Sequence, residues 1–314
     1  MVNPKRSKSL DVVALIFVGV SVLGAAIRWT VRDGHAYAAN LFYALPFIAI
    51  TGLLLAAGVV WIRNQRPAFS AACAVTALLA GGLWIHGGYF ANDCEPSPDR
   101  LRIFTWNAAR GFAGWPKVAD HVGATDPDLV GLVEAGGSTI EWLQFWAQHF
   151  PDHQIYLAGG GLVVLIRGEI VDKRVLRLVG TSTCADVRIV VDGRPMRVLL
   201  LDAVVHPFSN RRDVVERVFA LARETPEIPT IVMGDFNTPI DSVWFDEVRN
   251  DFTHAFEQAG QGMLTTWPTP APILAIDHVW LSRQFQVDCA SIGWNWASDH
   301  RPVVVDVRVP DEGS

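Results

Sequence analysis

Charged residues are nearly missing from the first third of this chain. Three stretches of the 314-residue sequence, 12–27, 36–62 and 67–92, contain no Asp, Glu, Lys or Arg, and they hold 16, 27 and 26 residues. A helix needs about 20 apolar residues to cross a bilayer core of about 30 Å. A signal peptide followed by core helices of a soluble protein would account for the first stretch only, because the other two are long and have no polar face. The pattern predicts a membrane anchor over residues 1–92 with three transmembrane helices, at about 11–31, 38–62 and 68–90.

The few basic residues beside these stretches predict an orientation. With three crossings, five lie on the side of the N-terminus and two on the opposite side. Because basic loops are enriched in the cytoplasm, we expect a multi-pass protein of the cell membrane with a cytoplasmic N-terminus. Everything after about residue 92 is then extracytoplasmic. The five are Lys5, Arg6, Lys8, Arg63 and Arg66, and the two are Arg28 and Arg32.

Basic charge is also scarce in the remainder of the chain. From residue 98 onward there are 19 Lys and Arg against 28 Asp and Glu, a net charge of −9. A domain that grips long nucleic acid usually has a basic face, so this balance disfavours such a domain. The sequence has no internal repeat of fixed period.

Cysteine is rare, and its spacing excludes a structural zinc site. The chain has four cysteines and no CxxC pair. Cys73 lies in the third apolar stretch, where a small packing residue is expected. Cys94, Cys184 and Cys289 would face an oxidising compartment, where one disulfide and one remaining thiol are possible; three free buried thiols are the alternative.

A polar segment with two prolines, 93–99, predicts a short extended linker. After it, short β-branched stretches alternate with amphipathic segments, which is typical of an α/β domain. We expect this domain over residues 100–310, followed by a tail at 311–314. The expected strands are 101–105, 129–133, 161–166, 185–191, 196–205, 230–233, 276–281 and 302–309, and the expected helices are 140–149 and 214–223.

Three acidic motifs stand at the ends of expected strands in the last third of the chain. Each places a carboxylate beside an amide or imidazole, next to a buried apolar run. Strand ends are rigid supports, and repeated Asp, Asn and His at such ends is what a metal-assisted hydrolytic site requires. The motifs are Gly234-Asp235-Phe236-Asn237, Ile276-Asp277-His278 and Ser298-Asp299-His300.

Together with three further motifs, this ordered set resembles the endonuclease/exonuclease/phosphatase family. The resemblance covers about residues 100–310. It implies a four-layer α/β sandwich, in which two packed mixed β-sheets are flanked by helices, and a hydrolase of phosphate esters that uses Mg²⁺, with Mn²⁺ possible. The further motifs are Phe104-Thr105-Trp106-Asn107, the segment 128–134 that ends in Val133-Glu134, and Gly161-Leu162-Val163-Val164-Leu165.

The resemblance assigns the metal to three residues. Glu134 would be the main ligand of the cation, Asn107 would stand beside it and hold the metal or a phosphate oxygen, and Asp299 would belong to the metal site or orient a histidine. Magnesium prefers hard oxygen ligands, which fits these side chains. A turn-forming role is the alternative for an Asn at a strand end, as for Asn107.

Four further residues carry the implied chemistry. Asp235 would align and deprotonate the attacking water, and Asn237 would hold the same centre, with an Asx turn as the alternative for this pair. His300 would contact the scissile phosphate and stabilise its charge, and Asp277 would orient a histidine. His278 follows Asp277 in a strand and therefore points to the opposite face.

His206 corresponds to the family's other histidine, a phosphate ligand, but its surroundings depart from the family pattern. Val204, Val205 and Pro207 replace the usual neighbours, and Val133 replaces a glutamine that often precedes the metal glutamate. These departures leave the relation to any one subfamily open.

The substrate is not encoded in any motif. Four tryptophans, Trp267, Trp280, Trp294 and Trp296, crowd the same end of the domain. Trp280 is expected in the core, and Trp294 and Trp296 either line a pocket or pack. Lipid headgroups, small phosphoesters and nucleic acid all remain candidate substrates. The lipid bilayer is an expected partner, and no protein partner is implied. A catalytically silent module that binds a phosphate ligand is the alternative function, but it should have lost a carboxylate or the terminal histidine, and none is lost.

Overall fold

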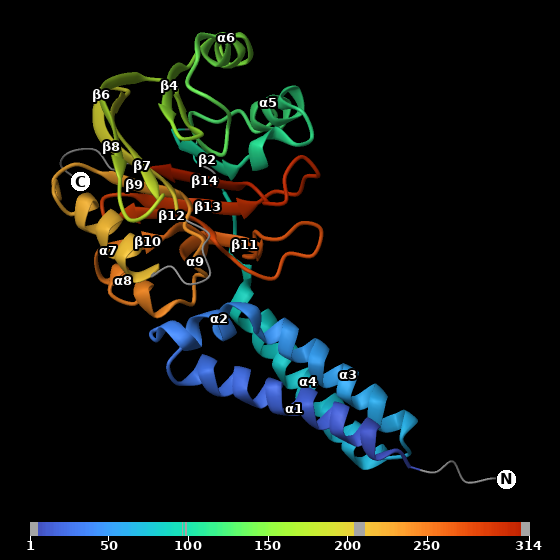
Figure 1. Cartoon of the computed structure of the whole chain (residues 1–314). Helices are drawn as coiled ribbons and strands as arrows, with labels where there is room; N and C mark the ends of the chain where they lie inside the picture. Colours follow the sequence, from blue (N-terminus) through green and yellow to red (C-terminus); the bar gives the residue numbers. More distant parts are fainter. Residues whose placement is uncertain (1–5, 96, 98, 204–210, 309–314) are drawn as a thin grey trace. The chain divides into compact units, whose positions relative to one another are not determined.

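The computed structural model describes residues 6–95, 97, 99–203 and 211–308. The chain divides into two compact units, one that ends at Tyr89 and one that begins at Phe90. Figure 1 shows the first unit as helices only and the second as a body of strands and helices. We describe each unit by itself.

The described residues of the first unit form four helices. They are α1 (Lys8–Trp29), α2 (Ala36–Ala44), α3 (Phe47–Arg63) and α4 (Pro67–Gly88). The segment expected as one helix at 38–62 is two helices, α2 and α3, which meet at an angle of 67° and together remain a candidate for one span. Pro46 has no N–H to continue the helix, and a residue before proline avoids helical geometry, as Leu45 does at φ −120° and ψ 56°.

The first unit has a narrow core and an apolar exterior. Ala14 of α1, Ala57 of α3 and Ala77 of α4 are buried where these helices pack together. Large apolar side chains face outward on the same helices, for example Leu15 and Leu78. By length and composition, α1 and α4 can each cross a membrane, and a third span exists if α2 and α3 together form one.

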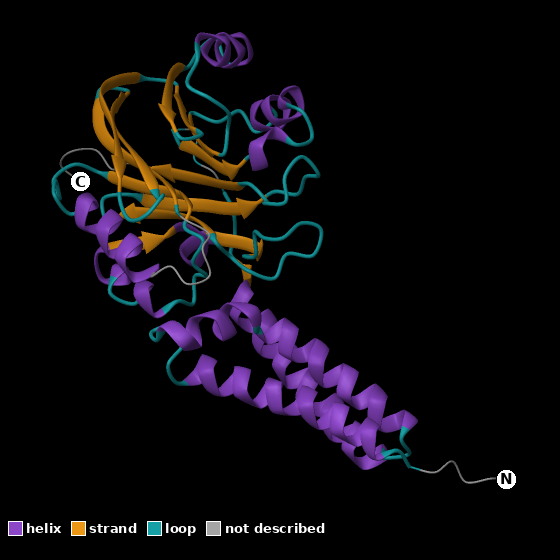
Figure 2. Ribbon diagram, in the orientation of Figure 1, coloured by secondary structure: helices purple, strands orange, loops and turns teal. Residues whose placement is uncertain are grey.

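Two mixed sheets form the second unit (Figure 2). The strand order is β1-β11-β13-β14-β2-β3-β5-β4 in the eight-stranded sheet and β10-β12-β9-β8-β7-β6 in the six-stranded sheet. The first sheet contains β1 (Tyr89–Ala91), β2 (Leu101–Asn107), β3 (Leu129–Val133), β4 (Gln154–Gly159), β5 (Leu162–Ile166), β11 (Gly260–Met263), β13 (Gln286–Ile292) and β14 (Val303–Arg308). The second contains β6 (Glu169–Arg177), β7 (Thr183–Val191), β8 (Arg194–Asp202), β9 (Thr230–Asp235), β10 (Phe252–His254) and β12 (Asp277–Ser282).

The layers confirm the predicted four-layer α/β sandwich. One core fills the space between the sheets, with Ile103 and Leu129 from the first sheet and Leu200 and Met233 from the second. Figures 1 and 2 show α5 (Trp115–Gly123) and α6 (Ile140–His149) on one side of the strands and α7 (Arg211–Ala222) on the other. Shorter helices are α8 (Val248–Asp251) and α9 (Ala255–Ala259), and two 3₁₀ turns are η1 (Ala109–Gly111) and η2 (Val243–Phe245).

The strand register brings polar residues to one edge of both sheets. In the first sheet β2 and β3 run parallel, with Asn107 opposite Val133. In the second sheet β8 and β9 run parallel, and Asp202 lies opposite Asp235. The antiparallel strand β12 begins with Asp277 opposite Asp235. Because the carboxyl ends of parallel strands lie at the same edge, these side chains can meet there.

A disulfide links the start of the second unit to its first sheet. Cys94 is bonded to Cys289 of β13, 195 residues away in sequence. Cys184 is a buried free thiol in β7, and burial raises its pKa far above the usual range. Cys73 is also free and buried. Of the two alternatives left open by the sequence, the structure has the disulfide with one remaining thiol in this unit.

Candidate active site

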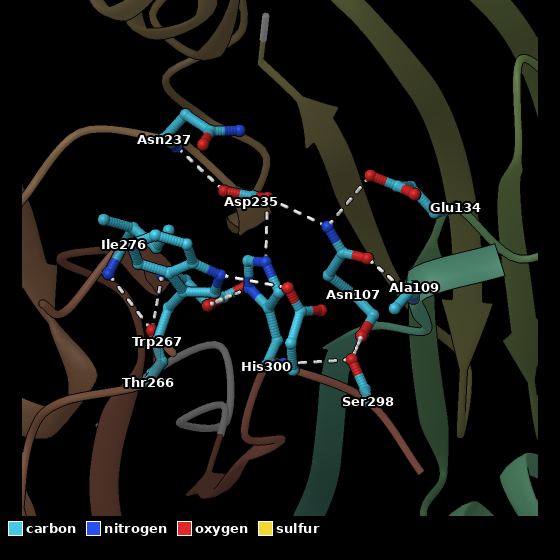
Figure 3. A network of polar contacts seen from close by, with 12 residues as sticks. Asn107, Ala109, Glu134, Asp235, Asn237, Thr266, Trp267, Ile276, Ser298 and His300 are labelled. Carbon is cyan, nitrogen blue, oxygen red and sulfur yellow. Dashed lines mark hydrogen bonds and ion pairs between the residues drawn. The ribbon is translucent and has the colours of Figure 1, made fainter. Parts of the chain in front are cut away.

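Asp235 is the buried centre of the polar network (Figure 3). It ends β9, and its Oδ1 accepts a hydrogen bond of 2.8 Å from the backbone N–H of Asn237. This is the Asx turn considered as an alternative, and it leaves Oδ2 directed at other polar groups. Asn237 has a left-handed backbone, φ 47°, and its Nδ2 donates to the carbonyl of Ala203 at 2.8 Å. The turn therefore orients the carboxylate.

Asn107 connects the two sheets. From the end of β2 its Nδ2 donates to Asp235 Oδ2 at 3.0 Å and to Glu134 Oε1 at 3.5 Å. Its Oδ1 accepts the N–H of Ala109 at 2.9 Å, and this bond fixes the orientation of the amide. The amide nitrogen therefore faces both carboxylates, and Asn107 orients them.

His300 is held between two aspartates. Its Nδ1 lies 2.9 Å from Asp277 Oδ2, and its Nε2 lies 3.9 Å from Asp235 Oδ2. Ser298 fixes the backbone here, because its hydroxyl accepts the N–H of His300 at 3.0 Å and donates to the carbonyl of Asn107 at 2.7 Å. All of these residues are buried. Asp277 is thus in hydrogen-bond contact with a histidine, and the serine of the last motif joins that motif to β2.

The surroundings raise the pKa of both Asp235 and His300, but by different causes. Burial and the neighbouring charge of Asp277 raise the pKa of Asp235 to about 7. Burial alone would lower the pKa of His300, but the charge and hydrogen bond of Asp277, with the charges of Asp235 and Asp299, raise it to about 10. The imidazole is therefore a cation at neutral pH, and Asp235 can accept a proton near that pH.

Glu134 lies directly after β3, beside a cavity. Its backbone is left-handed, φ 51°, and Gly161 approaches it so closely that a Cβ at that position would lie 3.1 Å from the Cα of Glu134. The carboxylate is 30% exposed and accepts a hydrogen bond of 3.0 Å from Nε of Arg110, whose own side chain is 87% exposed. Glu134 and Arg110 both line a cavity of about 580 Å³. The glycine of the Gly161 motif thus makes room for the glutamate.

Asp202, at the end of β8, was not predicted as a site residue. It lines the same cavity as Glu134. Burial and the charge of Glu134 raise the pKa of Asp202 to about 6. The sequence signal that was missed is the interruption of an apolar strand, 198–201, by a carboxylate at its end.

The other predicted residues lie further from this centre or outside the described part of the chain. Asp299 is exposed, and its Oδ2 accepts a hydrogen bond of 3.1 Å from Nε1 of Trp267. His206 lies outside the described residues. His278 is buried on the opposite face of β12, where its Nε2 donates to the carbonyl of Thr238 at 2.9 Å. Trp280 is buried in the core, as expected, whereas Trp294 and Trp296 are exposed.

The donor set fits a divalent cation through its carboxylates. Asp235, Asp277 and His300 each offer a ligand atom within 4.8 Å of the others. His300 is bonded through Nδ1 to Asp277, and a pKa of about 10 favours its imidazolium form, which makes it a weaker ligand than a carboxylate. Glu134 has a partly exposed carboxylate, and among the described residues its ionic partner is the solvent-exposed Arg110. Hard cations such as Mg²⁺ take carboxylate oxygens, so Glu134 is the residue best suited to hold one.

Comparisons with known proteins agree with this architecture. A family model described as the Endonuclease/Exonuclease/phosphatase family matches residues 104–300, more than half of the chain. A mannosyl-6-phosphatase from Bacteroides thetaiotaomicron superposes with a TM-score of 0.55 at 17% identity, over 66% of this chain and 99% of that one. TDP2 from D. rerio, complexed with single strand DNA product, superposes with a TM-score of 0.57 at 13% identity, over 67% of this chain and 99% of that one.

The human Nocturnin catalytic domain with bound sulfate gives a TM-score of 0.54 at 18% identity, over 70% of this chain and 97% of that one. At these identities the likeness establishes the fold. By sequence, no curated protein matches the chain.

Proposed function

Because the chain belongs to the endonuclease/exonuclease/phosphatase family, we propose that it is a membrane-anchored, divalent-metal-dependent phosphohydrolase. The enzyme class predicted from the sequence, a hydrolase of phosphate esters, is confirmed at the level of this family. The proposed reaction is in-line attack of water on a phosphoester.

The observation that carries this proposal is the line of buried groups from Asp277 through His300 to Asp235. A carboxylate with a pKa of about 7 can take a proton from an attacking water near neutral pH. An imidazolium held by Asp277 offers a fixed positive charge for the oxygens of the phosphate, where negative charge builds up during phosphoryl transfer. Asn107 keeps the base in place through its bond of 3.0 Å to Asp235.

We assign the metal to Glu134, with Mg²⁺ as the ion and Mn²⁺ possible. When bound, such an ion neutralises phosphate charge and polarises the ester. Asn107, which the sequence analysis placed among the ligands, has its amide nitrogen toward Glu134 and therefore orients this carboxylate. Asp299 is the further candidate ligand and His206 the further candidate phosphate contact.

Removal of the metal should abolish activity. We expect excess EDTA to stop hydrolysis and Mg²⁺ to restore it, and we expect Glu134→Gln to lower kcat/KM by about 10³-fold, since several kcal/mol of charge stabilisation is lost. The matched control is Glu169→Gln, an exposed glutamate of β6. The measurement is steady-state hydrolysis together with the thermal shift that Mg²⁺ produces. Full activity in EDTA, or an unchanged Mg²⁺ shift in Glu134→Gln, contradicts the assignment.

The substrate class is tested with a panel. The purified full-length chain in detergent, with Mg²⁺ and then with EDTA, is given p-nitrophenyl phosphate, bis-p-nitrophenyl phosphate, plasmid DNA, a sphingomyelin-type lipid and sugar phosphates. Turnover of at least one of them in Mg²⁺ supports a phosphohydrolase. No turnover of any member, together with no Mg²⁺ binding by calorimetry, contradicts it.

We propose that residues 1–92 form the membrane anchor, that 93–99 are the linker, that 100–310 form the catalytic domain and that 311–314 are a tail. The apolar helices α1 and α4 support the anchor. The Cys94–Cys289 disulfide supports the proposal that this cell-membrane protein carries its catalytic domain outside the cytoplasm, because disulfides persist in oxidising compartments. A reporter fused after Ser314 that is active only in the cytoplasm would overturn this topology.

Thiol counting in cells checks the same placement. When cells are treated with acid to trap thiols and the protein is then denatured, we expect a maleimide to label two cysteines, Cys73 and Cys184, before reduction and four after it. The control variant Cys94→Ser should show three thiols without reduction, because Cys289 is released. Four labelled cysteines before reduction would place the domain in a reducing compartment.

A further inference from the structure

The cavity beside Glu134 is lined in part by residues that the proposed reaction does not use. It measures about 580 Å³, large enough for a small organic group in addition to a phosphate. Glu134 and its partner Arg110 are part of the lining. The remaining lining includes Trp115, Trp142 and Asp202.

The tryptophans form a fixed apolar wall. Trp115 of α5 and Trp142 of α6 meet edge to face, with ring centroids 4.7 Å apart and planes at 80°. Gly136 packs against the second ring, since a Cβ there would lie 2.7 Å from two of the ring carbons of Trp142. The rings are nearly perpendicular, so the wall offers apolar contact without a pair of parallel faces between which a flat base could be inserted.

Asp202 contributes a carboxylate, a hydrogen-bond acceptor, to the lining of the cavity. In the part of the chain that the structure describes, its side chain makes no hydrogen bond or ion pair. The carboxylate stands half-buried at the end of β8, where it can accept hydrogen bonds from O–H or N–H groups inside the cavity. A ligand with hydrogen-bond donors would therefore be complementary to this part of the cavity.

We propose that this cavity binds the polyhydroxylated part of the substrate, a sugar or a cyclitol, whose phosphate lies at Glu134 and His300. The inference rests on the proposed function and names its substrate class. Hydroxyl groups can donate to Asp202, while the C–H groups of the ring contact Trp115 and Trp142. An alkyl chain would leave the carboxylate unpaired, and a second phosphate would be repelled by it.

The test compares substrates that differ only in the group attached to the phosphate. The full-length chain in detergent with Mg²⁺ is assayed on hexose 6-phosphates, inositol 1-phosphate, nucleoside 5′-monophosphates and p-nitrophenyl phosphate. We expect Asp202→Asn and Trp142→Leu each to lower the ratio of kcat/KM for the sugar or inositol phosphate to that for p-nitrophenyl phosphate by about 10-fold or more, mainly through KM. Matched controls are Asp152→Asn and Trp296→Leu, which change exposed residues outside the cavity and should keep the wild-type ratio.

Failure of this inference is distinct from failure of the proposed function. If hydrolysis persists and the kcat/KM ratio is unchanged in both cavity variants, the inference is overturned. It is also overturned if the wild type prefers nucleoside monophosphates and the variants remove that preference, because the cavity then binds a base. If the wild type hydrolyses nothing, calorimetry with hexose 6-phosphate and Mg²⁺ decides: binding that weakens about 10-fold in Asp202→Asn supports the cavity assignment, and equal or absent binding overturns it. Thermal unfolding shows whether each variant is folded.

Discussion

Replacement of Asp235 by asparagine is expected to lower kcat by about 10²–10⁴-fold, the contribution of a positioned general base. Asparagine keeps the size of the side chain and one acceptor oxygen, but it cannot take a proton from water. Since burial raises the pKa of Asp235 to about 7, wild-type kcat should rise with pH as this group loses its proton, and the residual activity of the variant should lose that rise. The measurement is a pH profile of kcat on the substrate with the fastest turnover.

Unfolding temperature separates a chemical effect from a structural one. The pKa of Asp235 in the folded chain, about 7, lies above its ordinary value of 3.8. The folded state therefore holds this proton more tightly, and ionisation of Asp235 costs stability as the pH rises from about 4 to 7. At pH 8 we expect Asp235→Asn to unfold at an equal or higher temperature than the wild type. Full activity of this variant would exclude Asp235 as the base; lost activity with a much lower unfolding temperature would point to a structural role.

Replacement of Asp277 by asparagine should have the second large effect, a loss of about 10²–10⁴-fold in kcat, because His300 then loses both its charge partner and its orientation. The pKa of His300, about 10 in the wild type, is raised chiefly by Asp277 against the opposing effect of burial. Without that carboxylate the pKa should fall. Activity that depends on the imidazolium should then disappear at a lower pH than in the wild type.

The decisive measurement for this variant is the pH at which kcat falls on the alkaline side of its pH profile, here called the basic limb. In the wild type, kcat should decline only as the pH approaches about 10, where His300 loses its proton. The stabilisation from the Asp277–His300 pair should be complete below about pH 6.5 and lost toward pH 10, since the folded pKa is the higher one. A control, Asp120→Asn on the exposed face of α5, should keep both the rate and the basic limb. An unmoved basic limb in Asp277→Asn would show that this aspartate does not hold the proton on His300.

The fold was predictable where strands are buried on both faces. β3 and β5 are continuous apolar runs, and they appear where the sequence indicates. β6 was missed because its side chains are mostly charged and exposed, which leaves no apolar run to recognise. The break between α2 and α3 was missed because composition, which favours a long apolar helix, was weighed above Pro46.

The candidate site was predictable for those residues that stand at the ends of strands. Asp235 and Asp277 stand at the ends of paired strands, and the network joins them to Asn107 and Glu134. Asp202 was hidden inside a strand expected to continue to residue 205. The partner of Cys94 could not be chosen from spacing, because it depends on where β13 lies in the sheet.

The bond between Asn107 and Asp235 has a mechanical consequence. One residue ends a strand of the eight-stranded sheet, and the other ends a strand of the six-stranded sheet. The distance between the base and Glu134 is therefore set by how the two sheets slide against each other over their shared apolar layer. If the proposed reaction holds, we expect a substitution deep between the sheets, at Met233 for example, to change the rate although it touches no polar atom of the site.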